Sequence, residues 1–138
     1  MQRNKLLFVV TLLIASLLFG CKKINDIEVT QVNGITAFNF SELMKDLPDK
    51  QSVYLMDLEV MNRQCTQDCQ HWILRAESAK QALTQKEIIY GKTPQGLIEK
   101  LKAKDLSSGE YSIDGLLLVK EGEQEIKTIN FRNIFFVK

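Results

Sequence analysis

The sequence has few of the residue types that form most catalytic and metal sites. Its 138 residues include one histidine, three cysteines and two prolines. Positive charge exceeds negative charge by only one, since the chain has 18 lysines and arginines and 17 acidic residues. No nucleic-acid-binding surface is therefore expected. Seven glycines and two prolines are too few for a collagen-like or low-complexity chain. The 45% of apolar residues is ordinary for one globular domain.

A basic and then apolar segment opens the chain. Arg3 and Lys5 precede residues 6–19, which are apolar except for Thr11 and Ser16. A membrane-spanning helix needs about 20 apolar residues, so this shorter segment indicates the hydrophobic part of a secretory signal peptide.

The apolar segment ends in Leu18-Phe19-Gly20-Cys21, which resembles the lipobox of bacterial lipoproteins. The resemblance implies cleavage before Cys21, a diacylglycerol on its thiol and a further acyl chain on its amine. Two or more acyl chains hold a protein stably to a membrane. We therefore expect Cys21 to be the site of lipid attachment.

This reading divides the chain into a signal peptide (1–20), a lipidated tether (21–26) and a single domain (27–138). Lys22 follows the lipidated cysteine, where enteric lipoproteins retained in the inner membrane have aspartate. A lysine instead of aspartate at this position resembles lipoproteins that are sent to the outer membrane. The expected location is therefore the cell envelope, on the outer membrane and facing the periplasm.

The other two cysteines are Cys65 and Cys69. In the oxidising compartment beyond the inner membrane, two thiols this close favour a disulfide. A redox-active pair or a metal site with His71 are the alternatives. The spacing superficially resembles the copper loop of Sco-type chaperones, but that family uses a thioredoxin fold and a distant histidine, and neither pattern is found. The Cys-x-x-Cys-His motif of c-type haem is not present.

The sequence pattern of the domain predicts mostly short strands separated by turns. The helical turn over 41–47 is expected to have Ser41 as its N-cap and Pro48 as its end. Polar residues over 77–86 predict a loop or a loose helical turn, and Asn33-Gly34 and 121–123 predict turns. Strands are expected from Ile27 and Val29 onward, continuing over 35–40, and then over 53–62, 71–75, 87–90, 97–104, 111–119 and from 129 to 137.

Alternation assigns side chains to the two faces of these strands. Tyr54, Met56, Leu58 and Val60 are expected to face the core, with Asp57 and Glu59 outward. Tyr111, Ile113, Leu117 and Val119 share one face of a later strand. In the last strand Ile129, Phe131, Phe135 and Val137 share a face that Asn133 interrupts, and Ile134 and Phe136 lie opposite, which predicts a bulge or a second covered face.

Residues 94–104 fit either a helix, with Thr93 as N-cap, or a strand. The following Leu106-x-x-Gly109-x-Tyr111 resembles the tyrosine corner of immunoglobulin-like and fibronectin type III-like sandwiches. In that family the tyrosine hydroxyl bonds to backbone a few residues upstream, the leucine closes the preceding strand and the glycine permits the turn. The resemblance favours a strand over 97–104.

The fold class expected is therefore an all-β, immunoglobulin-like or fibronectin type III-like antiparallel sandwich of about seven strands. Trp72 lies on the third expected strand, where such sandwiches commonly bury a tryptophan. Ile113 occupies the place of the second core cysteine of antibody domains, so the core resembles the fibronectin type without a disulfide.

No catalytic residue, cofactor or metal site is expected. His71 neighbours Trp72 in a strand, so it should face solvent if Trp72 is buried. Without a Gly-x-Ser-x-Gly elbow or a phosphate-binding glycine loop, no enzyme class is favoured. A lipid-anchored, non-catalytic module that binds or assembles another envelope protein is the first hypothesis. The second is an envelope inhibitor, similar to lipoproteins that block lysozymes, using the disulfide-braced loop 63–71.

Overall fold

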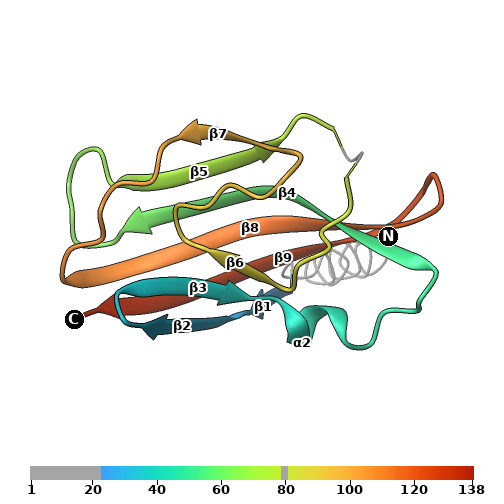
Figure 1. The fold of residues 1–138 in the computed structure, drawn as a ribbon, viewed down its shortest axis with the longest axis horizontal. Coiled ribbons are helices and arrows are strands. Elements are labelled where there is room, and N and C mark those ends of the chain that lie inside the picture. The colour runs from blue at the N-terminus through green and yellow to red at the C-terminus, as the bar shows by residue number, and fades with distance from the viewer. Residues whose placement is uncertain (1–22, 79–80) are drawn as a thin grey trace, which may run out of the picture.

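The computed structural model describes residues 23–78 and 81–138 as two β-sheets packed face to face (Figure 1). The prediction of an all-β sandwich is confirmed. The described residues form nine strands rather than about seven, because residues 24–26 form an additional strand and residues 28–39, expected as one continuous strand, form a hairpin of two.

The larger sheet has six strands, and all neighbours in it are antiparallel except β1 and β9. Residues 24–26, which the sequence assigns to the tether, belong to this sheet as β1. The strands in spatial order are β1 (Ile24–Asp26), β9 (Gln124–Val137), β8 (Gly109–Glu121), β4 (Gln51–Asn62), β5 (Gln70–Ala76) and β7 (Leu97–Leu101).

The smaller sheet consists of β2 (Glu28–Val32), β3 (Ile35–Asn39) and β6 (Glu87–Ile89). Asn33 and Gly34 have φ angles of 52° and 77°. Positive φ at both central residues is the requirement of a tight hairpin turn, and Asn-Gly is a sequence that satisfies it. The chain therefore reverses here, and residues 35–39 pair with 28–32 instead of continuing the same strand.

Apolar side chains from both sheets fill the space between them. Phe38 packs edge-on against Phe135 with ring centroids 5.8 Å apart, and Phe40 packs against Phe131 at 4.9 Å. The face predicted for β8 is confirmed, because all four of its residues are buried: Tyr111, Ile113, Leu117 and Val119.

A β-bulge in β4 reverses the predicted faces of its first half. Leu55 pairs with Leu117, but Asp57 pairs with Leu116, so Met56 is an extra residue. Leu58 and Val60 are buried as predicted, whereas Val53 and Leu55, not Tyr54 and Met56, face the core before the bulge. The prediction for Tyr54 and Met56 is wrong because alternation holds only within one unbroken ladder.

The bulge or cover predicted near Asn133 is not found there. The β8–β9 ladder is unbroken through Asn133, whose side-chain amide donates to the Ile27 carbonyl. Ile134 and Phe136 remain 42% and 64% exposed. The register shift of this hairpin lies close to its turn instead, between Val119 and Lys120.

Three local predictions have different outcomes. The helix α2 spans Ser41–Met44, and Ser41 is its first helical residue while Phe40 is the N-cap residue. The Asn39 side chain accepts the Ser41 N–H at 2.8 Å. The strand favoured over 97–104 is confirmed for Leu97–Leu101. The loop predicted over 77–86 contains no helix or strand in its described residues.

Candidate functional site

Tyr111 makes the hydrogen bond expected of a tyrosine corner. Its hydroxyl donates to the Ser107 carbonyl at 3.0 Å, and its ring is fully buried and stacks on Phe135 at 5.7 Å. Gly109 has φ +153°, and a Cβ there would lie 2.9 Å from the Gln64 side-chain oxygen. Leu106 packs against the core. The hydrogen bond from Tyr111 to Ser107 holds the connection between β7 and β8 against the buried face of β8.

A second tyrosine ties the same connection from the other side. The Tyr90 hydroxyl donates to the Lys104 carbonyl at 2.6 Å and lies 3.2 Å from the His71 carbonyl. Burial raises the pKa of Tyr90 well above its usual range. Sequence reasoning missed this residue, and its only signal is that it precedes Gly91, a turn glycine with φ 79°.

Trp72 is fully buried, on β5 next to the central strand β4. Its indole N–H donates to a Glu99 carboxylate oxygen at 2.8 Å, and its ring packs against Tyr90 at 5.2 Å. Glu99 lies in the middle of β7. Its role as the acceptor for a buried indole depends on the pairing of β5 with β7, which local sequence does not reveal.

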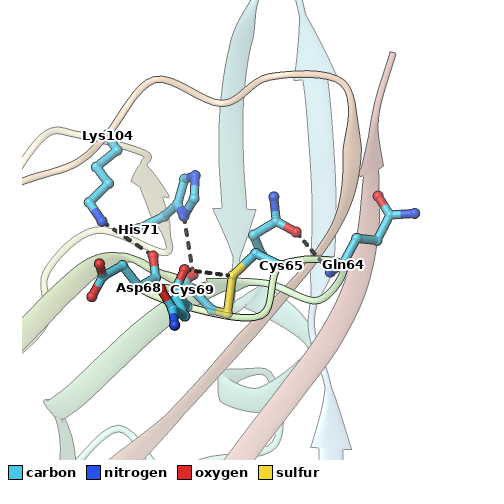
Figure 2. The surroundings of a disulfide bond; sticks show 8 residues. Gln64, Cys65, Asp68, Cys69, His71 and Lys104 are labelled. Atoms are coloured by element: carbon cyan, nitrogen blue, oxygen red, sulfur yellow. Dashed lines mark hydrogen bonds between the residues drawn. A yellow bond between two sulfur atoms is a disulfide. The ribbon is translucent and has the colours of Figure 1, made fainter.

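Cys65 and Cys69 form a disulfide across the loop between β4 and β5, with Cα atoms 5.5 Å apart (Figure 2). The loop is held at both ends, because the Asn62 N–H donates to the Cys69 carbonyl at 2.8 Å and Lys104 donates to the Asp68 carbonyl at 3.4 Å. Within residues 23–78 and 81–138, no three His, Cys, Asp or Glu side chains are grouped to hold a metal ion.

The prediction that His71 faces solvent is wrong. Its ring is half-buried and packs edge-on against Tyr111, with ring centroids 5.1 Å apart. Its Nδ1 lies 3.1 Å from the Cys69 carbonyl (Figure 2). Val60 pairs with Trp72 but Met61 pairs with Gln70, so His71 is the extra residue of a bulge. The bulge breaks alternation and lets His71 lie against the corner tyrosine.

Away from the disulfide loop, the chain forms a partly open cavity of about 670 Å³, here called the slot. It lies between the loop that precedes β6, the strand β6 itself and the segment that leads to β7. Volumes in this range are typical of ligand-binding pockets. The slot is lined by Tyr54, Leu55, Ala76, Ser78 and residues 81–89 and 92–97.

The free edge of β6 faces the slot. Residues 86–89 all line it, and because strand side chains alternate, consecutive residues reach one cavity only through the strand edge. The Phe40 N–H donates to the Lys86 carbonyl at 2.7 Å and the Tyr90 N–H to the Thr36 carbonyl at 2.9 Å. Residues 86, 88 and 90 therefore direct their backbone toward β3, and Glu87 and Ile89 direct theirs away from it.

Three of these outward backbone groups have no hydrogen-bond partner among the described residues. They are the Glu87 N–H, the Glu87 carbonyl and the Ile89 N–H. The fourth, the Ile89 carbonyl, accepts the Lys92 N–H at 3.0 Å. Sequence analysis did not find this site, because it depends on which strands β6 pairs with.

Cys21, the predicted lipid site, lies outside the described residues. Within the part that the structure describes, no helix is long and apolar enough to cross a membrane. Comparison with family models, curated proteins and solved structures gives no match to this chain.

Proposed function

We propose that the protein is a lipid-anchored module of the cell envelope that binds or assembles another envelope protein without catalysis. The lipobox ending in Cys21 supports the anchor. Strand β1 begins at Ile24, so only Lys22 and Lys23 separate the lipidated residue from the sheet. Such a short tether holds the edge formed by β1 and β9 close to the membrane on which the protein sits.

The strand order supports membership of the immunoglobulin-like class. In those sandwiches the first, second and fifth strands share one sheet, and the third, sixth and seventh share the other. Here β2, β3 and β6 form one sheet and take the places of the first, second and fifth strands. In the other sheet β4, β8 and β9 are neighbours and take the places of the third, sixth and seventh. Tyr111 lies at the start of β8, the place of the tyrosine corner in that class. This fold hosts many binding proteins, so the function rests on the site.

The slot is the observation that carries the binding function. It combines a cavity of about 670 Å³ with an unpaired strand edge. Edge strands left open in this way are the usual place where an extended chain is captured. The proposal places this binding role on the outer membrane, facing the periplasm, because Lys22 rather than aspartate follows Cys21.

An envelope inhibitor is the second candidate, and the loop 63–71 favours it. Thr66, Gln67 and Asp68 are exposed at its tip, while the disulfide and the contacts of Gln64 and Lys104 fix its base. A loop held in one conformation loses less entropy when it enters a partner's active site.

Labelling with palmitate tests the anchor. The parent protein should incorporate the label, and Cys21→Ser should not, leaving an uncleaved precursor or protein released from membranes. Label that persists in Cys21→Ser would contradict the lipoprotein assignment.

Photo-crosslinking in whole cells tests the binding function. A photoreactive side chain at Gln95, on the slot, should give a defined protein adduct, and one at Thr128, exposed on β9, should not. An adduct from Thr66 alone would favour the inhibitor. Adducts from none of the three positions would contradict both candidates.

A further inference from the structure

We propose that the slot binds an extended peptide segment of a protein partner, which adds as a strand to the free edge of β6. The inference rests on the proposed binding function and names the chemistry of its occupant. A strand in this position would extend the sheet of β2, β3 and β6 by one member.

The backbone of a peptide matches the groups that β6 leaves open. One peptide residue placed opposite Glu87 can donate its N–H to the Glu87 carbonyl and accept the Glu87 N–H. A carbonyl two residues away along an antiparallel peptide can accept the Ile89 N–H. These three bonds use all the outward groups of β6 that have no partner among the described residues.

The remaining walls suit the other edge and the side chains of such a strand. Gln81, Gln85 and Gln95 line the slot, and their side-chain amides can bond to the second edge of a bound backbone. Leu55 is buried and Leu97 partly buried, and both line the slot. A peptide with an apolar side chain directed inward and polar ones directed outward therefore fits best.

Charge favours a peptide that is close to neutral. The charged residues that line the slot are Lys86, Glu87 and Lys92, so both signs are present and no patch of one sign forms. A strongly acidic or basic segment would gain little there, and affinity should depend weakly on salt.

The fold has a vacant position at this place. In constant-type immunoglobulin sandwiches a further strand pairs with the fifth strand and completes a four-stranded sheet. Here β6 occupies the place of the fifth strand, and within residues 23–78 and 81–138 no strand pairs with its second edge. The peptide would take the position of that fourth strand.

Selection from a phage-displayed library of random twelve-residue peptides tests the proposal. The target is the lipidated full chain in detergent micelles. Enriched peptides should show apolar residues at alternate positions, and their addition should slow amide hydrogen exchange at Glu87 and Ile89. No enrichment, or enriched peptides that leave both amides unchanged, would overturn the proposal.

Variants that fill the slot supply the control. Ala82→Trp and Gln95→Trp place a large ring in the slot and should each weaken binding of an enriched peptide at least tenfold. Thr128→Trp, on exposed β9 surface, should leave it unchanged. Circular dichroism checks that each variant is folded, and equal binding by parent and both slot variants would overturn the proposal.

Failure here can be told apart from failure of the proposed function. If an envelope protein crosslinks to the parent and equally to Ala82→Trp, the binding function stands and the strand-addition site is wrong. If library peptides bind the slot but no envelope protein crosslinks to the cell-borne protein, the site stands and the proposed function is wrong.

Discussion

Two regions of this sandwich differ in how their backbone polar groups are hydrogen-bonded. The braced end, formed by residues 62–71 and 102–111, holds each connection with a side chain or a disulfide. The Tyr111 hydroxyl donates a hydrogen bond to the Ser107 carbonyl, and the Tyr90 hydroxyl donates one to the Lys104 carbonyl. A disulfide closes the loop after β4. The slot has the opposite character, because β6 presents three backbone groups with no partner among the described residues.

Rigidity and binding capacity therefore lie in different parts of the molecule. Buried backbone groups in native proteins are almost always paired, so unpaired ones on a strand edge mark a surface that can still accept partners. In the braced end, side chains and a disulfide hold the connections between strands. Substitutions in the two regions should therefore differ in their effect on the free energy of unfolding.

Removing the corner tyrosine should have the largest effect. Tyr111→Ala should lower the free energy of unfolding by about 3–5 kcal/mol, because a fully buried ring is lost. Tyr111→Phe keeps the ring and loses only the bond to Ser107, at a cost of about 1–3 kcal/mol. Urea unfolding measures both, and a Tyr111→Phe protein as stable as its parent would show that the hydrogen bond does not hold the corner.

Removing the disulfide should have the next largest effect. The double variant Cys65→Ser/Cys69→Ser should lose about 2 kcal/mol, the value that chain entropy gives for so short a loop. Reducing agent should lower the stability of the parent by the same amount and leave the double variant unchanged. A double variant with parental stability would mean that the hydrogen bonds at Cys69 and Asp68 hold the loop without the bridge.

Tyr90→Phe should cost about 1 kcal/mol at neutral pH, because the Lys104 carbonyl loses its donor. It should also change the response to alkali. Burial raises the pKa of Tyr90, so the unfolded chain loses this proton first, near pH 10, and stability falls as pH rises beyond that point. Tyr90→Phe should show a smaller loss between pH 10 and pH 11 than the parent, and an equal loss would contradict the assignment.

Variants in the slot should change stability least. Gln95 is exposed on its wall and makes no side-chain hydrogen bond to the described residues, so Gln95→Ala should shift stability by no more than about 0.5 kcal/mol. A loss above about 1 kcal/mol would show that the slot wall is part of the braced structure and not a free binding surface.

The braced end could be predicted from sequence further than the slot could. The local motif of the corner consists of Leu106, Gly109 and Tyr111. Its hydrogen bond spans four residues, so its geometry depends on one short segment of the chain. The disulfide spans four residues as well. Chemistry carried by neighbours in the chain can be predicted without knowledge of the fold.

Other features depend on pairing between distant segments. Bulges at Met56 and His71 reverse or break alternation, and both are visible only when the partner strands are aligned. Glu99 accepts the Trp72 indole because β7 pairs with β5, 27 residues earlier. The slot is the strongest case, since it is defined by the second edge of β6 and by what does not pair with it.

Amide hydrogen exchange along β6 in the full chain measures whether the edge of this strand at the slot is open. Glu87 and Ile89, whose N–H groups point into the slot, should exchange at least about tenfold faster than Ile88 and Tyr90, whose N–H groups point toward β3. Alternation of fast and slow exchange along this strand is the predicted result. Equal exchange at all four residues would contradict the account, because the slot edge would then be no more open than the paired edge.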